Sequence, residues 1–538
     1  MRESILILGA GVMQGPAIRT AKEMGLFTVA ADGDPRAVCA SMADRFERVD
    51  LKDKEGMERL ALSLRADSGT KLGGIMTAGT DFSATVAWVA GRLGLPGVPF
   101  EAALNASDKE RMRSCFAGAG VPSPGFTVIK EVPDKDITGL SYPVVVKPVD
   151  NMGGRGCRRA DTFAGLQDAA ADSLRFSRSG RAIVESFMEG PEFSVDAVIY
   201  RGEITVCGLA DRHIFFPPYF IEMGHTMPSR AGSGTQRLLL ETFEAGVRAL
   251  GIAGENCCGA AKGDVKLTPS GPMIGEIAAR LSGGYMSGWT YPYASGAEPV
   301  RGAILAALGR KPEGLIPVRS WTCAERAFIS IPGKVRDILD GEKARTAAYV
   351  RDLFFRIERG SAVTFPENNV GKCGNVIAAA PDRESAVSAA EKAAAAVLIR
   401  LEAPRAETAA FLDAGLLDEE PCEKPGRDLS RIFPPCAFDA GPSLLSLLRD
   451  MPDPVPARPA GDTVLDFPEF TSSNQSDWMG RTVEESLDAV RRITGCPLAP
   501  VKTARRGTLG RRFWAALIRG GYQGAAYLLD ELGHGGGP

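Results

Sequence analysis

Short apolar runs alternate with stretches of helical periodicity at the start of the chain. Ser4–Leu8 and Phe27–Ala31 predict buried strands on either side of a helix at Pro16–Met24. The alternation continues with strands at Phe46–Val49 and Gly74–Thr77 and with helices at Lys54–Leu64 and Phe82–Leu93. Strands that alternate with helices are typical of an α/β domain with a parallel sheet.

Strands follow one another more closely in the middle of the chain. We expect a helix at Ala106–Ala119, with Ser107 as its N-cap, and another helix at Gln236–Leu250. The expected strands are Pro143–Lys147, Ala182–Glu185, Glu192–Tyr200, Gly259–Leu267 and Met273–Ile277. The last two form a predicted hairpin, because Thr268-Pro269-Ser270-Gly271 between them has the residues that turns favour.

The pattern changes again towards the end of the chain. Strands are expected at Arg351–Ile357 and Asn375–Ala379, followed by an alanine-rich helix at Ser385–Leu401. Closely spaced prolines predict an irregular segment over 421–460, and helices follow at Glu484–Ile493 and Phe513–Leu532. We therefore expect a Rossmann-like domain over 1–104, a core domain over 105–319, a small α/β lobe over 320–404 and an extension over 405–538.

Composition narrows the class of protein. Lysine and arginine total 63 against 66 acidic residues, so the net charge of −3 gives no reason to expect a nucleic-acid partner. The eleven cysteines form no CxxC pair, which favours a reduced, cytoplasmic protein. Three histidines are too few for a multi-histidine metal centre. We expect neither a signal peptide nor a membrane-spanning helix, because no apolar run approaches about 18 residues.

The glycine turn after the first predicted strand matches a dinucleotide-binding turn only in part. Gly9 and Gly11 fit that pattern, but Gln14 stands where it requires a third glycine, and Asp32 follows too soon to be its usual acidic residue. A tight turn is therefore favoured over nicotinamide or flavin binding. The following helix N-terminus can still attract an anion, such as a substrate carboxylate.

A second glycine loop carries stronger evidence for phosphate binding. Lys147 ends a predicted strand, and the loop Gly153-Gly154-Arg155-Gly156 follows directly. Backbone amides in such a loop can surround a triphosphate while Lys147 and Arg155 supply positive charge. The order of residues is not that of a P-loop.

Further along, Glu185, Phe187 and Met188 stand at a strand edge that can present backbone groups to an adenine, and Glu192 can accept hydrogen bonds from a ribose. Asp264 and Glu276 lie on the two strands of the predicted hairpin. Two carboxylates on one side of a hairpin suit Mg²⁺, which prefers oxygen ligands and bridges nucleotide phosphates.

The order of these elements resembles the ATP-grasp superfamily. Four segments carry the likeness: Asn105–Lys109, Val144–Gly156, Glu185–Asp196 and Gly263–Gly284. The resemblance implies an α/β fold with a Rossmann-like N-terminal domain, an ATP-grasp core and a closing lobe. It also implies that Lys109 and Lys147 contact ATP phosphates, that Glu185 lies at the adenine edge and that Glu192 binds the ribose.

The resemblance implies that Asp264 and Glu276 hold Mg²⁺, with Mn²⁺ as an alternative, and that Arg280 lies near the γ-phosphate or an acyl phosphate. This chain departs from the family in two places. Asp264 stands where many members carry Glu, and Ala278 stands where many carry Asn. Alanine cannot bind a metal ion, so the number of metal ions stays open.

Within the superfamily the chain is most similar to carboxylate–amine ligases, especially amino-acid ligases. Pro217–Ser229 resembles their substrate loop, in which Glu222 and His225 would be catalytic residues facing the acceptor or the carboxylate. The alternative is a loop in which Glu222 is solvated and His225 packs locally.

The implied activity is that of an ATP-dependent ligase, which activates a carboxylate as an acyl phosphate and joins it to an amine. A bicarbonate-activating enzyme similar to biotin carboxylase or carbamoyl phosphate synthase, and a regulatory module that binds ATP without turnover, are the alternatives. The expected partners are small-molecule substrates, and family members are often dimers. Near the end of the chain, Arg505, Arg506, Arg511 and Arg512 form a basic cluster, for which a solvated helix face is favoured over a membrane or partner contact.

Overall fold

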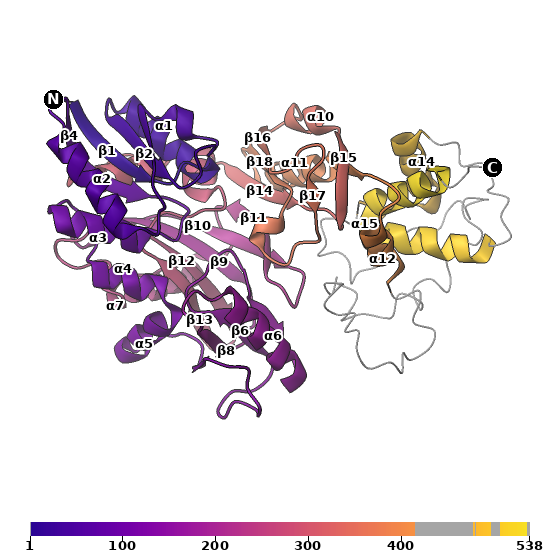
Figure 1. The fold of residues 1–538 in the computed structure, drawn as a ribbon, viewed down its shortest axis with the longest axis horizontal. Helices are drawn as coiled ribbons and strands as arrows, with labels where there is room; N and C mark the ends of the chain where they lie inside the picture. The colour runs from indigo at the N-terminus through magenta and orange to yellow at the C-terminus, as the bar shows by residue number, and fades with distance from the viewer. Residues whose placement is uncertain (1, 415–476, 479, 496–505, 535–538) are drawn as a thin grey trace. The chain divides into compact units, whose positions relative to one another are not determined.

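The computed structural model describes residues 2–414, 477–478, 480–495 and 506–534 (Figure 1). The chain forms two compact units. Unit 1 comprises residues 1–213, 224–325 and 379–387, and unit 2 comprises 214–223, 326–378 and 388–538. The domain division predicted from the sequence, with boundaries after residues 104, 319 and 404, stays a prediction.

Unit 1 begins with a parallel sheet in the order β3-β2-β1-β4. Its strands are β1 (Arg2–Leu8), β2 (Phe27–Asp32), β3 (Arg45–Arg48) and β4 (Thr70–Thr77). Ile5 and Ile7 of β1 pack in one cluster with α1 (Gly15–Glu23) and α9 (Pro299–Ala307), whereas Leu6 and Leu8 pack with α2 (Lys54–Ala66) and α3 (Ser83–Leu93) (Figure 1). Because helices bury both faces, the central strands β1 and β2 carry runs of buried, mostly apolar residues, as predicted, whereas the edge strand β3 has no buried residue.

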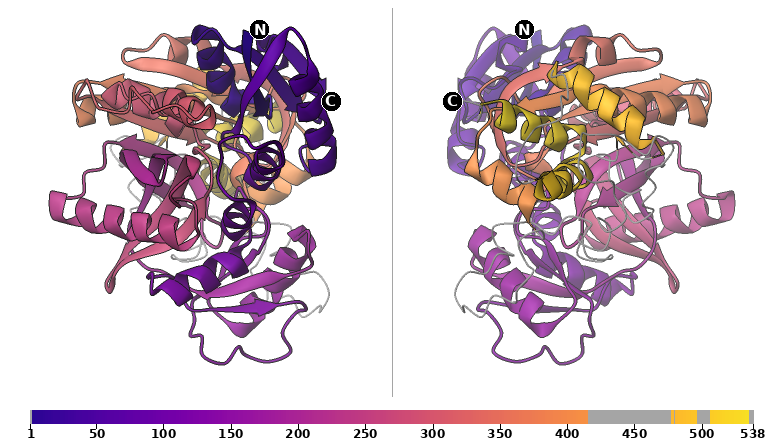
Figure 2. Two further views of the ribbon diagram at one scale, coloured as in Figure 1. Left: turned by 90° about the vertical axis from the view of Figure 1, so that its left-hand side faces the viewer. Right: turned by 90° about the vertical axis from the view of Figure 1, so that its right-hand side faces the viewer.

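A small antiparallel sheet follows, in the order β5-β8-β6-β7. Its strands are β5 (Phe126–Ile129), β6 (Val144–Pro148), β7 (Arg158–Ala160) and β8 (Ala182–Ser186). Helix α6 (Phe163–Phe176) packs on this sheet through Leu166, Ala169 and Ala170 (Figures 1 and 2). The loop between β6 and β7 contains the predicted phosphate-binding glycines.

Unit 1 also contains most of the residues of six strands that follow the order β13-β12-β9-β10-β11-β14. These are β9 (Glu192–Tyr200), β10 (Glu203–Phe215), β11 (Ile221–Met227), β12 (Cys258–Thr268), β13 (Gly271–Ala278) and β14 (Thr322–Phe328). Helices α4 (Phe100–Ser107), α5 (Lys109–Ala119) and α7 (Ser233–Ala249) share one core with β9, β12 and β13. The predicted hairpin is confirmed, since β12 and β13 are joined by a turn at Pro269 and Ser270.

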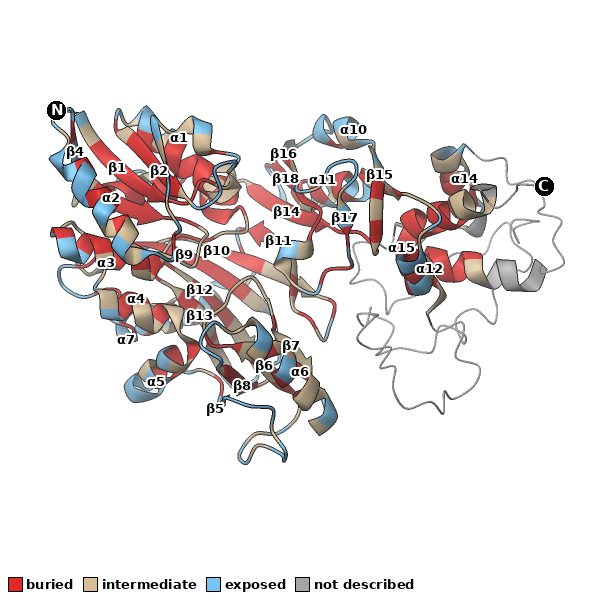
Figure 3. Cartoon of the chain, in the orientation of Figure 1, coloured by how far each residue is buried: buried red, intermediate tan, exposed pale blue. Residues whose placement is uncertain are grey.

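The remaining helices of unit 1 are short. They are η1 (Val12–Gln14), η2 (Ala40–Met42), the π-helix η3 (Met286–Thr290) and α8 (Tyr291–Ser295). The strands of unit 1 are mostly buried, whereas exposed residues lie on the outer faces of the helices (Figure 3).

Two sequence predictions about helices are wrong. The helix expected over 106–119 is divided at Asp108, whose side chain accepts hydrogen bonds from the backbone of Glu110 and Arg111 and so caps α5. Ser107 is not the cap, because its hydroxyl donates to the carbonyl of Ala103. The helix expected over 385–401 ends earlier: α11 covers Arg383–Ala396, and Leu398–Leu401 forms strand β19 against β15 (Gly333–Leu339).

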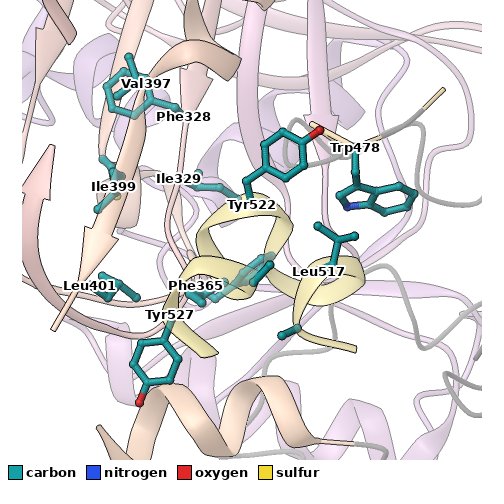
Figure 4. Packing of buried hydrophobic residues seen from close by; sticks show 14 of the residues in the cluster. Phe328, Ile329, Phe365, Val397, Ile399, Leu401, Trp478, Leu517, Tyr522 and Tyr527 are labelled. Atoms are coloured by element: carbon teal, nitrogen blue, oxygen red, sulfur yellow. The ribbon is translucent and has the colours of Figure 1, made fainter. Parts of the chain in front are cut away.

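Unit 2 contains β16 (Val350–Phe355), which pairs antiparallel with β18 (Gly374–Ala380), and most of β18 itself. It also contains a three-stranded sheet in the order β17-β15-β19, where β17 is Ala362–Val363. Its helices are α10 (Gly341–Arg345), η4 (Asn369–Gly371), α12 (Ala406–Asp413), α14 (Val483–Thr494) and α15 (Arg506–His534), together with most of α11. Figure 4 shows their common core, in which Trp478, Leu517 and Tyr522 lie near Ile329.

The two helices predicted near the end of the chain are confirmed as α14 and α15. Helix α15 is interrupted at Gly521, which has a positive φ of 60°. The Asp477 carboxylate accepts a hydrogen bond from the Tyr522 amide just after this break. The predicted irregular segment over 421–460 and Arg505 lie outside the described residues. Of the basic cluster, Arg512 forms ion pairs with Asp413 and Glu531.

Within the part of the chain that the structure describes, no helix combines the length and the apolar character needed to cross a bilayer.

Candidate active site

The side chains of Asp32, at the end of β2, and of Gln14 hold the first glycine turn closed. The Asp32 carboxylate accepts a hydrogen bond from the Ala10 amide at 2.8 Å, and Gln14 Oε1 accepts one from the Gly11 amide at 2.9 Å. A Cβ atom on Gly9 would lie 2.9 Å from Gln14 Cδ, so the glutamine fills the space beside the turn. This geometry favours the tight-turn interpretation over dinucleotide binding.

Lys109 begins α5 and is directed into the interior of unit 1. Its side chain is 8% exposed, and its Nζ donates to the carbonyl of Asn151 at 2.7 Å and lies 3.8 Å from Glu276 Oε1. The Lys109 amide also donates to the carbonyl of Val149, at the start of the glycine loop. One residue therefore joins the helix, the loop and the hairpin.

Lys147 on β6 forms an ion pair with Glu185 on β8, with 2.8 Å between Nζ and Oε2. The other oxygen of Glu185 accepts a hydrogen bond from Arg113 Nε at 2.9 Å. Glu185 and Arg113 are almost fully buried. Burial raises the pKa of Glu185, but the two cations outweigh it and hold this pKa below its ordinary value.

The loop between β6 and β7 holds Gly153, Gly154 and Gly156 with φ values of 69°, 75° and 67°. Such backbone favours glycine, because other side chains are strained there. Arg155 between them donates from Nε to Asn151 Oδ1 at 3.0 Å. The loop thus has the conformation that the glycines predict.

The segment after β8 carries two aromatic–cation contacts and a carboxylate. The Phe187 ring lies 4.6 Å from the Arg159 guanidinium and 5.0 Å from Lys266 Nζ. Lys266 Nζ also donates to the carbonyl of Met188 at 2.9 Å and lies 3.8 Å from Glu192. Glu192 forms a second ion pair with Arg212 of β10.

The hairpin places Asp264 of β12 directly opposite Glu276 of β13. Directly opposed residues on antiparallel strands have Cβ atoms about 5 Å apart, so both carboxylates can reach one cation. One oxygen of Asp264 accepts a hydrogen bond from Ser194, and the other contacts Lys262 and Arg212.

The two hairpin carboxylates are held in their charged forms. Burial raises the pKa of Asp264, but Arg212 and Lys262 bring it below its ordinary value. Burial also raises the pKa of Glu276, and Lys109 and Lys262 bring it down. Both residues therefore present negative charge near neutral pH.

Arg280, two residues beyond β13, turns towards the loop that follows β4. Its Nε donates to the carbonyl of Thr80 at 2.9 Å, and the neighbouring Asp81 lies 3.3 Å from Arg178. Burial raises the pKa of Asp81, partly offset by Arg280 and Lys109. One pocket is lined by Thr80, Asp81, Ser83, Ala106, Ser107, Lys109, Asn151, Glu276, Ala278 and Arg280.

His225 and Glu222 do not line this pocket. The predicted loop over 217–229 is wrong in its larger part, because Ile221–Met227 forms strand β11. His225, 1% exposed, lies in unit 1 with its Nδ1 3.0 Å from Glu325 Oε2, and Glu222 lies in unit 2 with an oxygen 3.9 Å from Lys372 Nζ. Their catalytic roles stay predictions.

Sequence reasoning missed four charged residues at this site: Asp81, Arg113, Arg212 and Lys262. The sequence contains a signal that could have indicated two of them, Asp81 and Arg113. Asp81 follows the carboxyl end of a parallel strand, where α/β domains place ligand-binding residues. Arg113 stands four residues after Lys109, so both share one face of a helix.

Two family models match parts of the chain. An ATP-grasp domain matches residues 106–284, and L-amino acid ligase C-terminal domain 2 matches residues 327–402. The chain therefore contains both domains, as the sequence resemblance implied.

Known proteins extend these matches. Carnosine synthase 1 of Gallus gallus is 27% identical over 336 residues, covering 58% of this chain and 36% of that protein. A D-alanine–D-alanine ligase of Marinobacter nauticus is 30% identical over 131 residues, covering 23% and 39%. The chain thus spans well under half the length of both relatives. The crystal structure of an L-amino acid ligase from Bacillus licheniformis, 21% identical, has a TM-score of 0.64 and covers 75% of this chain and 99% of that chain. This likeness confirms the predicted fold class.

Proposed function

We propose that the chain is an ATP-grasp ligase that activates a carboxylate with ATP and joins it to the amine of an amino acid. The observation that supports this most directly is the pocket shared by Lys109, Glu276, Arg280 and Asp81. Three stretches of the chain contribute these residues, namely α5, β13 with the segment that follows it, and the loop after β4. In this proposal they supply cations for a phosphate chain beside a carboxylate for a metal ion.

In this proposal, the ATP phosphates lie among Lys109, Lys147 and the glycine loop with Arg155. The adenine lies at the strand edge formed by Glu185, Phe187 and Met188, and its ribose is bound by Glu192. Lys266 already bridges Met188 and Glu192, which keeps the two parts of this binding segment together.

The residues fit a divalent metal ion in part. Asp264 and Glu276 supply opposed carboxylate oxygens, and Glu276 remains 36% exposed at its side chain. Among the described residues no group of three or more His, Cys, Asp and Glu side chains could hold a metal ion. Phosphate oxygens and water must therefore complete the coordination, as is usual for Mg²⁺. When bound, the ion would neutralise phosphate charge and orient the γ-phosphate.

The reaction proceeds in two steps. A carboxylate oxygen of the first substrate attacks the γ-phosphorus, the bond to the β-phosphate oxygen breaks, and ADP leaves. The resulting acyl phosphate is then attacked at its carbonyl carbon by the amine of the second substrate, and inorganic phosphate leaves as the amide forms. Most of the catalytic effect comes from alignment and from charge neutralisation by Lys109, Lys147 and Arg280.

The amine must lose a proton during the second step. Two carboxylates line the pocket, Glu276 and Asp81, and Asp81 lies on the loop after β4. Burial raises the pKa of Asp81, and the nearby Arg280 offsets this in part. We assign it the binding of the substrate ammonium group and the removal of its proton. His225, hydrogen-bonded to Glu325, and Glu222 remain proposed substrate-binding residues, and a test of His225 is given below.

The test is ADP release with Mg-ATP across a panel of amino acids, singly and in pairs, with mass spectrometry of the products. We expect release that requires two amino acids and a product mass equal to their sum minus water. ADP release with bicarbonate alone would replace this proposal by carboxylase chemistry. ATP binding without turnover across the panel would replace it by a regulatory role.

Four further expectations belong to this proposal. The metal ion is Mg²⁺, with Mn²⁺ as an alternative. The protein acts in the cytoplasm on small molecules, without nucleic acid, and it forms a homodimer. These statements rest on composition and on the family resemblance.

A further inference from the structure

Four side chains occupy adjacent positions on one face of the hairpin. Strands β12 and β13 pair Asp264 with Glu276 and Lys262 with Ala278. Residues two apart on a strand point to the same side of the sheet, so all four share one face. Two of them offer oxygen atoms, one offers an ammonium group, and Ala278 offers no ligand.

The ammonium group is fixed within this face. Lys262 Nζ contacts Asp264 Oδ2, and the Lys262 side chain is 14% exposed. Its positive charge lowers the pKa of both carboxylates. Among the cations, its effect is second to that of Arg212 at Asp264 and second to that of Lys109 at Glu276. Lys262 is therefore part of the electrostatics of the metal site, although the sequence patterns did not mark it.

We propose that Lys262 limits this site to one divalent cation and supplies, in place of a second one, further positive charge for the phosphate chain. The inference rests on the proposed function. A cation between Asp264 and Glu276 has protein oxygens on both sides. Lys262 and Arg212 already contact one oxygen of Asp264, which leaves its other oxygen and Glu276 for a cation. A second cation beside Glu276 would meet the methyl group of Ala278 instead of an oxygen ligand, and the Lys262 ammonium would repel it.

The lysine and the alanine act together in this arrangement. Lys262→Ala alone removes the ammonium group but leaves Ala278, which offers no metal ligand. Ala278→Asn alone adds an oxygen ligand but leaves the repulsion by Lys262. Only the combined change Lys262→Ala with Ala278→Asn removes the charge and adds an amide oxygen opposite it. Lys262→Arg is the matched control, because it keeps a positive charge at the same position.

The test counts Mn²⁺ bound to the full chain in the presence of a non-hydrolysable ATP analogue, by the loss of the free-ion signal in electron paramagnetic resonance. Binding of a fluorescent ATP analogue shows that each variant retains its nucleotide site. We expect one Mn²⁺ per chain for the unmodified protein and for Lys262→Arg, and two for the double variant.

Two Mn²⁺ ions in the unmodified protein would overturn the inference, and so would a double variant that binds the nucleotide with a single Mn²⁺. The proposed function fails in a different way. In that case the unmodified chain would bind neither the nucleotide analogue nor Mn²⁺ in the same experiment.

Discussion

Glu185→Gln removes the carboxylate that neutralises two cations in the interior of unit 1. Arg113 lies 2.9 Å from one oxygen of Glu185 and Lys147 lies 2.8 Å from the other. Arg113 is 0% exposed, and its other hydrogen bond to a described residue is to the carbonyl of Gly275, at 2.6 Å, which carries no full negative charge. The glutamine has nearly the same shape, so the variant isolates the loss of charge.

The size of the effect follows from burial. Removing one partner of a buried ion pair leaves an uncompensated charge and costs about 3–5 kcal/mol. The same change at Glu241, whose side chain is 62% exposed and 3.9 Å from Arg237, should cost less than about 1 kcal/mol. Glu241→Gln is therefore the matched control.

The pH dependence provides a second readout with a defined sign. Burial raises the pKa of Glu185, but Arg113 and Lys147 lower it further, so the folded pKa lies below the ordinary value of 4.5. The stability that this carboxylate contributes is present above about pH 4.5 and is lost as the pH falls through the folded pKa. We expect the difference between the unmodified chain and Glu185→Gln to shrink in that range.

Hydrogen–deuterium exchange of peptides from β6 and β8 measures the opening of this region without assuming that the two units unfold together. At about 1.4 kcal/mol per tenfold change, the predicted cost corresponds to at least about a hundredfold faster exchange in Glu185→Gln. A change of less than about tenfold, or an equal change in Glu241→Gln, would refute the reasoning.

Three further predictions follow from the site and from unit 2. Glu276→Gln should abolish Mg²⁺-dependent ADP formation, because it removes one of two opposed carboxylate charges; unchanged turnover would exclude Glu276 from the metal site. His225→Ala should lower kcat while ATP affinity, measured by titration, stays the same; a parallel loss of ATP binding, or no effect, would remove His225 from the substrate site. Burial raises the pKa of Asp477 to about 7, so the folded state binds this proton more tightly than the unfolded state and unit 2 loses stability as the pH rises from about 4 to about 7. Asp477→Asn, which keeps an oxygen for the Tyr522 amide, should remove that slope in urea titrations and be more stable than the unmodified chain at pH 8, and a variant that retains the slope would contradict this assignment.

Local patterns in the sequence were enough to predict most elements and the order of the nucleotide-binding segments. Buried parallel strands produce continuous apolar runs, and the turn at Thr268–Gly271 has the residues that such a turn requires, so β1, β2, β12 and β13 were predictable. The glycine loop and the two hairpin carboxylates were predictable for the same reason. Their chemistry depends on residue types at fixed short spacings along the chain.

The predictions failed where the outcome depends on residues distant in the sequence. Leu398–Leu401 continues an alanine-rich helical pattern but forms a strand, because its backbone pairs with β15.

The charge partners of the site depend on distant residues in the same way. Arg113 meets Glu185 across 72 positions, and Arg280 meets the loop after β4 across 200. Lys262 becomes part of the proposed metal site only in the folded chain, where the hairpin register pairs it with Ala278. Burial and electrostatic pairing act through space, so folding determines which charges share the pocket.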